Sequence, residues 1–531
     1  MRLTTLYRGG HVYTPADPTA TAMLVAGDRI TWLGKDADAP PADATVELDG
    51  ALVTPAFVDA HVHATDTGIV ALGLDLSGTI SAADVLDRVA AHAATLPTDA
   101  IVVGHGWDES SWSIQTPPSA AELDRAGGGR STYLSQVSVH SAVVSSDLLA
   151  STPINTPGYD AVGWLRRDAH HVVRGMTMGV MSGAQRDRAQ RAALHRAASL
   201  GIAAVHECGG PGTSSEYDFQ NVLALGREPD LPDVYGYWGE LGGAQRAREL
   251  GAVGAGGDLY ADGALGSQTA HLREPYLDAG DPTHRGHGYV SAEEAGAHLI
   301  ECTEAGIQGG FHAIGDAAIT TVLAGFAIAG AKLGVDRIRL ARHRIEHAEI
   351  IDKTLIAAFV EYGIVASVQP AFDRLWGGDH AMYAQRLGVE RSRASNPLGS
   401  LAGVGVALAF GSDSPVTPID PWGTVRAAVN HHNPAQRIGV RTAFAAHTRG
   451  GWRAVHADAE GTLVPGAAAT FVVWATPSGL TNGLPTLAAA GPGEPAPPLP
   501  TCLSTVVRGT TIFDNDVTAR SAPAGRPGPS S

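Results

Sequence analysis

The chain has 531 residues, of which 44% are hydrophobic and 17% charged, and its formal net charge is −17. This is a globular composition, long enough for one large domain with additions or for two to three domains. The acidic balance argues against a nucleic-acid-binding surface, which needs basic patches, and we expect the charge only to keep the protein soluble.

Three cysteines, Cys208, Cys302 and Cys502, are scattered along the chain and form no C-x-x-C pair. Neither a disulfide framework nor a structural zinc cluster is therefore expected. The first residues lack the apolar core of a signal peptide, and no apolar run approaches the ~20 residues that a membrane span needs. We predict a cytoplasmic protein that binds no membrane. Whether it forms a homodimer stays open.

Residues 1–54 contain short predicted strands with turns, and Gly27-Asp28 between two apolar runs predicts a hairpin. Residues 456–515 have the same character. Chain ends often lie close together, so we predict that these two segments pair into one small β-sandwich. The tail, residues 516–531, is rich in Pro, Gly, Ala and Ser and is predicted to be disordered.

Between these ends, eight apolar segments are candidate barrel strands, and alanine-rich helical segments separate several of them. Alternation of strands and helices indicates a parallel sheet. The predicted fold class is therefore α/β, with a (β/α)8 TIM barrel over residues 55–455. The candidate strands are residues 52–63, 202–207, 231–238, 257–263, 307–312, 338–347, 364–369 and 405–413.

This strand count requires residues 72–198 to be an insertion after the first barrel strand. The segment is far longer than an ordinary loop and should carry its own structure. It contains AIVVGHGWDESSW and STYLSQVSVHS, which look like strands that end in polar and aromatic residues. We expect the insertion to cover the mouth of the barrel.

Histidines and one aspartate recur at the ends of the predicted strands. His61 and His63 are two residues apart, so in a strand they point to the same side and can bind one ion together. His312, His347 and Asp413 follow at intervals of 35 and 66 residues, about one and two β-α-β repeats. Active sites of such barrels lie at the carboxyl ends of the strands. Imidazole with carboxylate suits zinc or another first-row divalent metal.

Asp413 can do more than bind metal. A divalent ion lowers the pKa of bound water to about 7, and a carboxylate beside that water could take its proton and pass it to a leaving amine. The sequence SDSP around Asp413 is also good turn chemistry. The four histidines in register with Asp413 favour the catalytic role.

Seven motifs occur in an order that resembles the amidohydrolase superfamily over nearly the whole chain. The closer similarity is to the family 3 branch that includes the N-substituted formamide deformylases. The motifs are PAFVDAHVH, GHGWDESSW, ADGALGSQTA, FHAIGDAAI, RIEHAE, SVQP and FGSDSPV. The resemblance implies a metal-dependent hydrolase of carbon–nitrogen bonds, mostly amides outside peptides, with a small-molecule substrate.

By the same resemblance, His61 and His63 bind a more buried metal together with Asp413. His312 and His347 would then bind a second, more exposed metal, or complete a single-metal site. One or two ions, zinc above all, are therefore expected.

One position departs from this family pattern. Many members carry a carboxylated lysine on the fourth strand that bridges two metals, whereas this chain has Asp258 in GDLYADG. The only lysines, Lys35, Lys332 and Lys353, lie in other predicted elements. Asp258 could bridge two metals, leave a one-metal site, or be structural.

Four further residues are candidates for substrate binding. Trp107 could form a wall of the pocket and Asp108 could orient polar groups, or the pair could be a buried tryptophan with a capping aspartate. His206 ends the second strand, and His140 lies in the insertion within a stretch that resembles a family motif. Either histidine could bind substrate, or be an ordinary core or surface residue.

Two rival functions stay open. Deaminases on this fold place a glutamate close after the fifth-strand histidine, and the run HAIGDAA has none. A non-catalytic binding or regulatory protein could keep the fold, although all five principal ligand positions are filled here. Arg344 and Glu346, two residues apart on the sixth strand, predict an ion pair inside the barrel.

Overall fold

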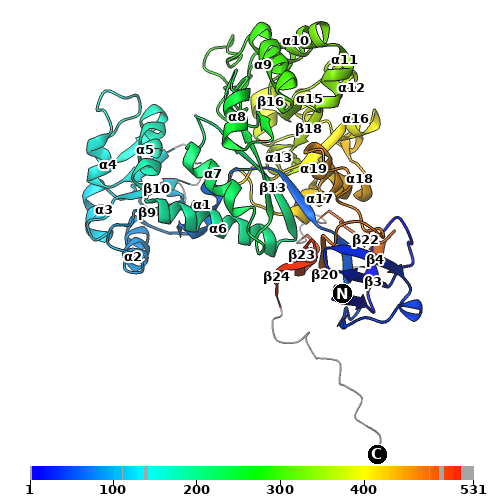
Figure 1. The fold of residues 1–531 in the computed structure, drawn as a ribbon. Helices are drawn as coiled ribbons and strands as arrows, with labels where there is room; N and C mark the ends of the chain where they lie inside the picture. The colour runs from blue at the N-terminus through cyan, green and yellow to red at the C-terminus, as the bar shows by residue number, and fades with distance from the viewer. Residues whose placement is uncertain (1–2, 110–111, 137–140, 478, 490–495, 516–531) are drawn as a thin grey trace, which may run out of the picture. The chain divides into compact units, whose positions relative to one another are not determined.

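A computed structural model describes residues 3–109, 112–136, 141–477, 479–489 and 496–515. The chain divides into two compact units, one formed by Met1–His63 with Leu194–Ser531 and the other by Ala64–Ala193. Each unit is described by itself, and their elements are labelled in Figure 1. The predicted disordered tail, 516–531, lies outside the described residues.

The larger unit is built around a parallel sheet whose eight strands follow one another in chain order. Neighbouring strands pair in parallel throughout. A bridge from Val62 to Ser414, with the Asp413 N–H donating to the His61 carbonyl at 2.8 Å, joins the last strand to the first. This confirms the predicted (β/α)8 barrel. The strands are β7 (Phe57–Val62), β13 (Ile202–Gly209), β14 (Asp233–Trp238), β15 (Gly254–Ala255), β16 (Gln308–Ala313), β17 (Arg344–His347), β18 (Val365–Val368) and β19 (Ala407–Phe410).

Three strand predictions differ from the structure. Residues 257–263 do not form the fourth strand, which is the short β15, because Gly257 has a φ of +71° and ends it. Residues 338–341 belong to helix α11 (Val335–Ala341), and the sixth strand begins only at Arg344. The segment 52–63 is two strands, of which the first, β6 (Leu52–Pro55), belongs to the sandwich.

Helices α9 (Ala292–Ala305), α10 (Asp316–Leu333) and α12 (Lys353–Tyr362) follow strands of the barrel and pack around it. Ser291 and Glu294 form a capping box that starts α9, and Gly306, in the left-handed conformation, ends it. Within the described chain, α10 is the one helix that is long and apolar enough to cross a membrane by length and composition. It contacts α9 and β16 and buries residues in the barrel core. A core helix can be as apolar as a membrane-spanning helix for this reason.

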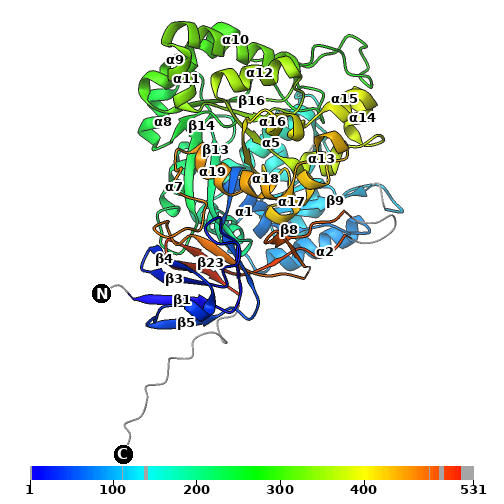
Figure 2. The same cartoon turned by 90° about the vertical axis from the view of Figure 1, so that its right-hand side faces the viewer.

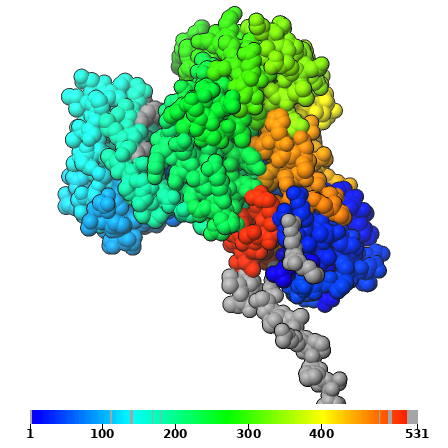
Figure 3. Space-filling view, viewed as in Figure 1, coloured from blue at the N-terminus to red at the C-terminus, as the bar shows by residue number. Residues whose placement is uncertain are grey.

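The β-sandwich takes strands from both chain ends. One sheet is formed by β1 (Thr4–Arg8), β3 (Ala22–Ala26), β4 (Arg29–Gly34) and β5 (Ala44–Glu47). The other joins β2 (His11–Val12) and β6 to β20 (Phe471–Ala475), β23 (Thr501–Val507) and β24 (Thr510–Asp514). The two ends therefore lie side by side in Figures 1 and 2, and in Figure 3 the red C-terminal strands lie next to the blue N-terminal segment.

Ala64–Ala193 forms its own α/β layer structure. Its five-stranded sheet consists of β8 (Leu74–Asp75), β9 (Val102–Trp107), β10 (Thr132–Gln136), β11 (Ser141–Val144) and β12 (Trp164–Arg166). Helices α2 (Ala82–Ala93), α3 (Ala120–Ala126) and α5 (Arg167–Val180) accompany it. The segment predicted as an insertion thus carries its own structure, while its covering of the barrel mouth stays a prediction.

Candidate metal centre

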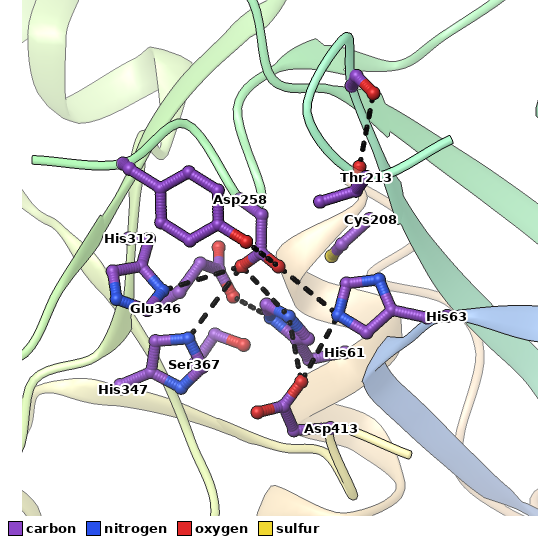
Figure 4. A network of polar contacts seen from close by, with 12 residues as sticks. His61, His63, Cys208, Thr213, Asp258, His312, Glu346, His347, Ser367 and Asp413 are labelled. Carbon is purple, nitrogen blue, oxygen red and sulfur yellow. Dashed lines mark hydrogen bonds and ion pairs between the residues drawn. The ribbon is translucent and has the colours of Figure 1, made fainter. Parts of the chain in front are cut away.

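Six potential metal ligands meet at the carboxyl ends of the barrel strands (Figure 4). His61 and His63 come from the end of β7, His312 from β16 and His347 from β17, and Asp413 follows β19. Asp258 comes from the loop after β15. His347 and Asp413 have φ values of +69° and +55°, which are uncommon for residues other than glycine and recur at functional sites. The structure therefore brings together all the residues predicted as ligands.

The distances between these side chains suit a shared cation. Asp258 Oδ1 lies 3.3 Å from His61 Nε2 and 3.5 Å from His312 Nδ1, and Asp258 Oδ2 lies 3.2 Å from His63 Nε2. Asp413 Oδ1 lies 3.5 Å from His61 Nε2 and 3.2 Å from His63 Nε2. Ligands about 2.0–2.1 Å from a tetrahedral zinc ion are separated by roughly 3.3 Å. The spacing thus fits first-row metal coordination.

The ring nitrogens are oriented for the same purpose. His61 Nδ1 faces Glu346 Oε2 at 3.0 Å, His347 Nδ1 faces Gln369 Oε1 at 2.8 Å, and His312 Nε2 faces the Gly263 carbonyl at 3.3 Å. These acceptors fix the N–H on the outer nitrogen of each ring and turn the lone pair of the other nitrogen inward.

The inward atoms have no hydrogen-bond partner among the described residues. His61 Nε2, His312 Nδ1, His347 Nε2 and Asp258 Oδ1 are all buried in this state. Such polar atoms are costly to bury unless they bind something. Because they converge on one another, we conclude that these side chains fit a divalent metal ion.

The electrostatics of the cluster call for positive charge. Burial lowers the pKa of His63, but Asp258 and then Asp413 outweigh it and raise that pKa well above its usual value. Burial raises the pKa of Asp258, but His61 and His63 outweigh it and hold that pKa well below its usual value. Two buried carboxylates therefore need either imidazolium protons or a cation, so metal binding should release protons.

A buried ion pair lies directly beneath the centre, as the sequence predicted. Arg344 Nε and Nη2 donate to the two oxygens of Glu346, each at 2.9 Å, and both side chains are fully buried. Arg344 also donates to the Ala60 carbonyl at 2.6 Å and to Ser367 Oγ at 2.9 Å, and its guanidinium stacks on Tyr237. Glu346, held in this way, in turn orients His61.

Of the four predicted substrate-binding residues, His206 belongs to the same compact unit as the ligand cluster, and Trp107 and Asp108 belong to the Ala64–Ala193 unit. His206 is fully buried in the barrel, where its Nδ1 faces Arg344 Nη1 at 2.8 Å, a position that agrees with the core-histidine alternative. Substrate binding by His206 stays a prediction. Trp107 is fully buried in the core of the Ala64–Ala193 unit and donates to the Leu134 carbonyl at 2.9 Å. This position agrees with the buried-tryptophan alternative, and a wall of the substrate pocket stays a prediction. Asp108 directly follows β9, and its role stays a prediction. His140 lies outside the described residues.

Two residues at the centre were not predicted from the sequence. Gln369 orients His347, and the Tyr260 hydroxyl lies 3.4 Å from Asp258 Oδ2. Asp258, followed by burial, raises the pKa of Tyr260 well above its usual value. Gln369 lies in the SVQP motif, which could have singled it out, whereas no sequence signal marks Tyr260.

A second group of side chains, Asp373, His431 and His432, also lies close together but suits metal less well. His431 Nδ1 accepts a hydrogen bond from the Asn433 N–H at 3.0 Å, and His431 Nε2 faces the Asn396 carbonyl at 3.1 Å. Both nitrogens are used, so no lone pair is left for an ion. We interpret this group as a hydrogen-bonded brace at the end of α17 (Pro421–Val429).

Comparison with known proteins agrees with this geometry. The amidohydrolase family model matches residues 44–513. The chain is 27% identical to the putative amidohydrolase YtcJ of Bacillus subtilis, over 88% of this chain and 93% of that protein. It is 23% identical to the N-substituted formamide deformylase of Arthrobacter pascens, over 76% of this chain and 78% of the relative. A crystal structure of an uncharacterized metal-dependent hydrolase from Pyrococcus furiosus aligns with a TM-score of 0.74 and 25% identity, covering 88% and 98% of the two chains.

The barrel, the ligand cluster at its carboxyl end and the family match over most of the chain define a hydrolase built on a metal-binding (β/α)8 barrel. The chain belongs to the amidohydrolase family.

Proposed function

We propose that this protein is a metal-dependent amidohydrolase that hydrolyses a non-peptide amide bond of a small molecule. The observation that carries the proposal is the convergence of histidine nitrogens and carboxylate oxygens at 3.2–3.5 Å from one another beside Asp413. Four of the converging atoms, on His61, His312, His347 and Asp258, are buried without a hydrogen-bond partner among the described residues. The relative named for deformylation of N-substituted formamides supports an amide as the substrate class.

His61, His63 and Asp413 would hold the metal, with His312, His347 and Asp258 completing the site. We propose zinc, because imidazole and carboxylate ligands with this spacing suit it. When bound, such an ion acidifies water and polarises a carbonyl group.

Asp413 is placed to move the proton. Its Oδ1 faces His61 and His63, its side chain is nearly buried, and its pKa lies below the usual value, since His61 and then His63 outweigh the effect of burial. A carboxylate in this position can accept a proton from the attacking water. It would then give that proton to the leaving amine.

The deaminase alternative has weak support. Asp316, the first acidic residue after His312, lies at the start of α10 and accepts the N–H of Arg273 at 2.8 Å. It is thus engaged away from the cluster. The non-catalytic alternative leaves unexplained why four histidine rings share an inward orientation toward two carboxylates.

The test is hydrolysis of a panel of N-substituted formamides and acetanilides by purified protein, before and after chelation and after zinc is restored. Turnover that disappears on chelation and returns with zinc supports the proposal. Full turnover by protein shown to be free of metal would refute it, and release of ammonia from aminopurines or aminopyrimidines instead would favour the deaminase.

A further inference from the structure

The loop after β15 carries a tyrosine to the edge of the candidate metal centre. The Tyr260 ring packs on His312 with ring centroids 4.8 Å apart, and its hydroxyl lies 3.4 Å from Asp258 Oδ2. The loop runs along β16: the His312 N–H donates to the Leu259 carbonyl at 2.9 Å, and the Ala261 N–H donates to the His312 carbonyl at 2.8 Å. The hydroxyl is therefore held in place before any substrate binds.

Tyr260 lies between the cluster and the solvent. It is 40% exposed, whereas Asp258 and His312 beside it are only 8% and 7% exposed. A substrate has to approach the buried ligands from their exposed side. The phenol is thus placed where an approaching carbonyl group would meet it.

Three of the histidine rings in the cluster have no N–H group that points toward such a carbonyl group. The N–H groups of His61, His347 and His312 point outward, to Glu346, Gln369 and the Gly263 carbonyl. Amide hydrolysis places growing negative charge on the carbonyl oxygen, and a donor aimed at that oxygen stabilises the transition state. The Tyr260 phenol has one O–H, which donates to Asp258 Oδ2 at 3.4 Å, a long hydrogen bond that a substrate oxygen would replace.

We infer that Tyr260 is a catalytic residue that donates a hydrogen bond to the carbonyl oxygen of the substrate, an inference that rests on the proposed function. Water adds its oxygen to the carbonyl carbon while its proton passes to Asp413. The π pair moves onto the carbonyl oxygen, which accepts the Tyr260 O–H. The pair then returns, the carbon–nitrogen bond breaks, and the amine leaves with the proton from Asp413. Water is the only co-reactant.

The first test is Tyr260→Phe in the full-length, zinc-loaded protein, assayed on the amide of the panel that wild type hydrolyses fastest. We expect kcat to fall about 10²-fold with KM within about twofold, because the lost hydrogen bond forms only in the transition state. Tyr289→Phe is the matched control: Tyr289 is also half-exposed, follows the same loop, and packs on His287 rather than on a ligand. A rate for Tyr260→Phe equal to that of Tyr289→Phe would overturn the inference.

A second readout needs no turnover. Methylphosphonate resembles the tetrahedral, negatively charged transition state, and its binding to the zinc-loaded proteins can be measured by calorimetry. Wild type and Tyr289→Phe should bind it about tenfold more tightly than Tyr260→Phe, with equal zinc content in all three. Equal binding, or no binding to wild type, overturns the inference. A defect that excess zinc corrects also overturns it, since Tyr260 would then only support Asp258. If wild type binds methylphosphonate more tightly than Tyr260→Phe does but hydrolyses no amide, the donor role of Tyr260 is supported and the proposed substrate class is refuted.

Discussion

Two carboxylates with different neighbours stand at opposite sides of the cluster. Asp413 Oδ1 faces the two histidines of β7. Asp258 contacts all four histidines, at distances from 3.2 to 3.8 Å. This difference separates the roles that we assign to them: Asp413 moves protons, and Asp258 sets how many ions the site can hold.

Replacing Asp413 with asparagine keeps the size of the side chain and removes its basicity. We expect Asp413→Asn to fold normally and to lose at least ~10² in kcat, the usual scale for loss of a general base. Steady-state kinetics and a thermal melt check this, with the exposed Asp281→Asn as control. Near wild-type turnover would place the base elsewhere.

Asp258 stands where the resemblance predicts a bridging lysine, so repulsion between two ions would be offset only by this carboxylate or by water. We predict that one tightly held metal suffices and that a second binds weakly and depends on Asp258. Activity should then reach its plateau near one equivalent of zinc added to the apo-protein. A plateau only at two equivalents, abolished in Asp258→Ala, would show that this aspartate bridges two ions.

At the scale of elements, β17 supplies one candidate ligand, His347, and the residues that support another, His61. His347 reaches the cluster, while Arg344 and Glu346 point into the barrel interior and fix His61 on the first strand. The short strand therefore connects two sides of the metal centre through buried charge.

Glu346→Gln should show two separable effects. Zinc affinity should fall 10- to 100-fold, because His61 loses the carboxylate that orients it. Stability should fall by about 3–5 kcal/mol, because Arg344 is left as an unpaired buried charge. Zinc titration and denaturant unfolding measure the two. In Arg344→Met/Glu346→Gln the stability should recover while zinc affinity stays low; recovery of both would argue against an orienting role.

The sequence predicts elements well where one signal dominates. The strands ending near His312 and Asp413 are apolar runs bounded by glycine or polar residues, and the ligands at their ends followed from the fold. The strand prediction for residues 257–263 was wrong, because the fourth barrel strand is only two residues long, Gly254–Ala255. Tyr260 was missed for the same reason: its contact with the centre depends on how that loop lies along β16, which no local pattern encodes.

For the whole molecule, histidines buried away from the metal centre link stability to pH. Burial lowers the pKa of His298 to about 4, of His343 to about 3 and of His447 to about 4. His298 is held between the Gly242 N–H and the Ala255 carbonyl, each at 3.1 Å. Since these rings stay neutral in the folded state while the unfolded chain protonates them below about pH 6.5, the unfolded state binds more protons in acid.

The stabilising effect of these histidines is therefore complete above about pH 6.5 and is lost as the pH falls toward 4. Each should contribute up to about 1.4 kcal/mol per pH unit to the slope of unfolding free energy against pH. Denaturant unfolding of the metal-free protein between pH 7 and 4.5 tests this. His298→Gln should flatten the slope and the exposed His11→Gln should not; an unchanged slope in His298→Gln would contradict the assignment.

Because the sandwich joins both chain ends, its first strands are synthesised long before the strands with which they pair. Thr54 of β6 pairs with Val472 of β20, about 420 residues later. At the usual rate of protein synthesis, roughly 5–20 residues per second, β6 waits about 20–80 s for that partner to be made. Throughout this interval the strand LVTP, whose four residues are all buried in the folded protein, has an edge that is available to other chains. Nascent chains of this protein should therefore depend on chaperones until the last strands leave the ribosome.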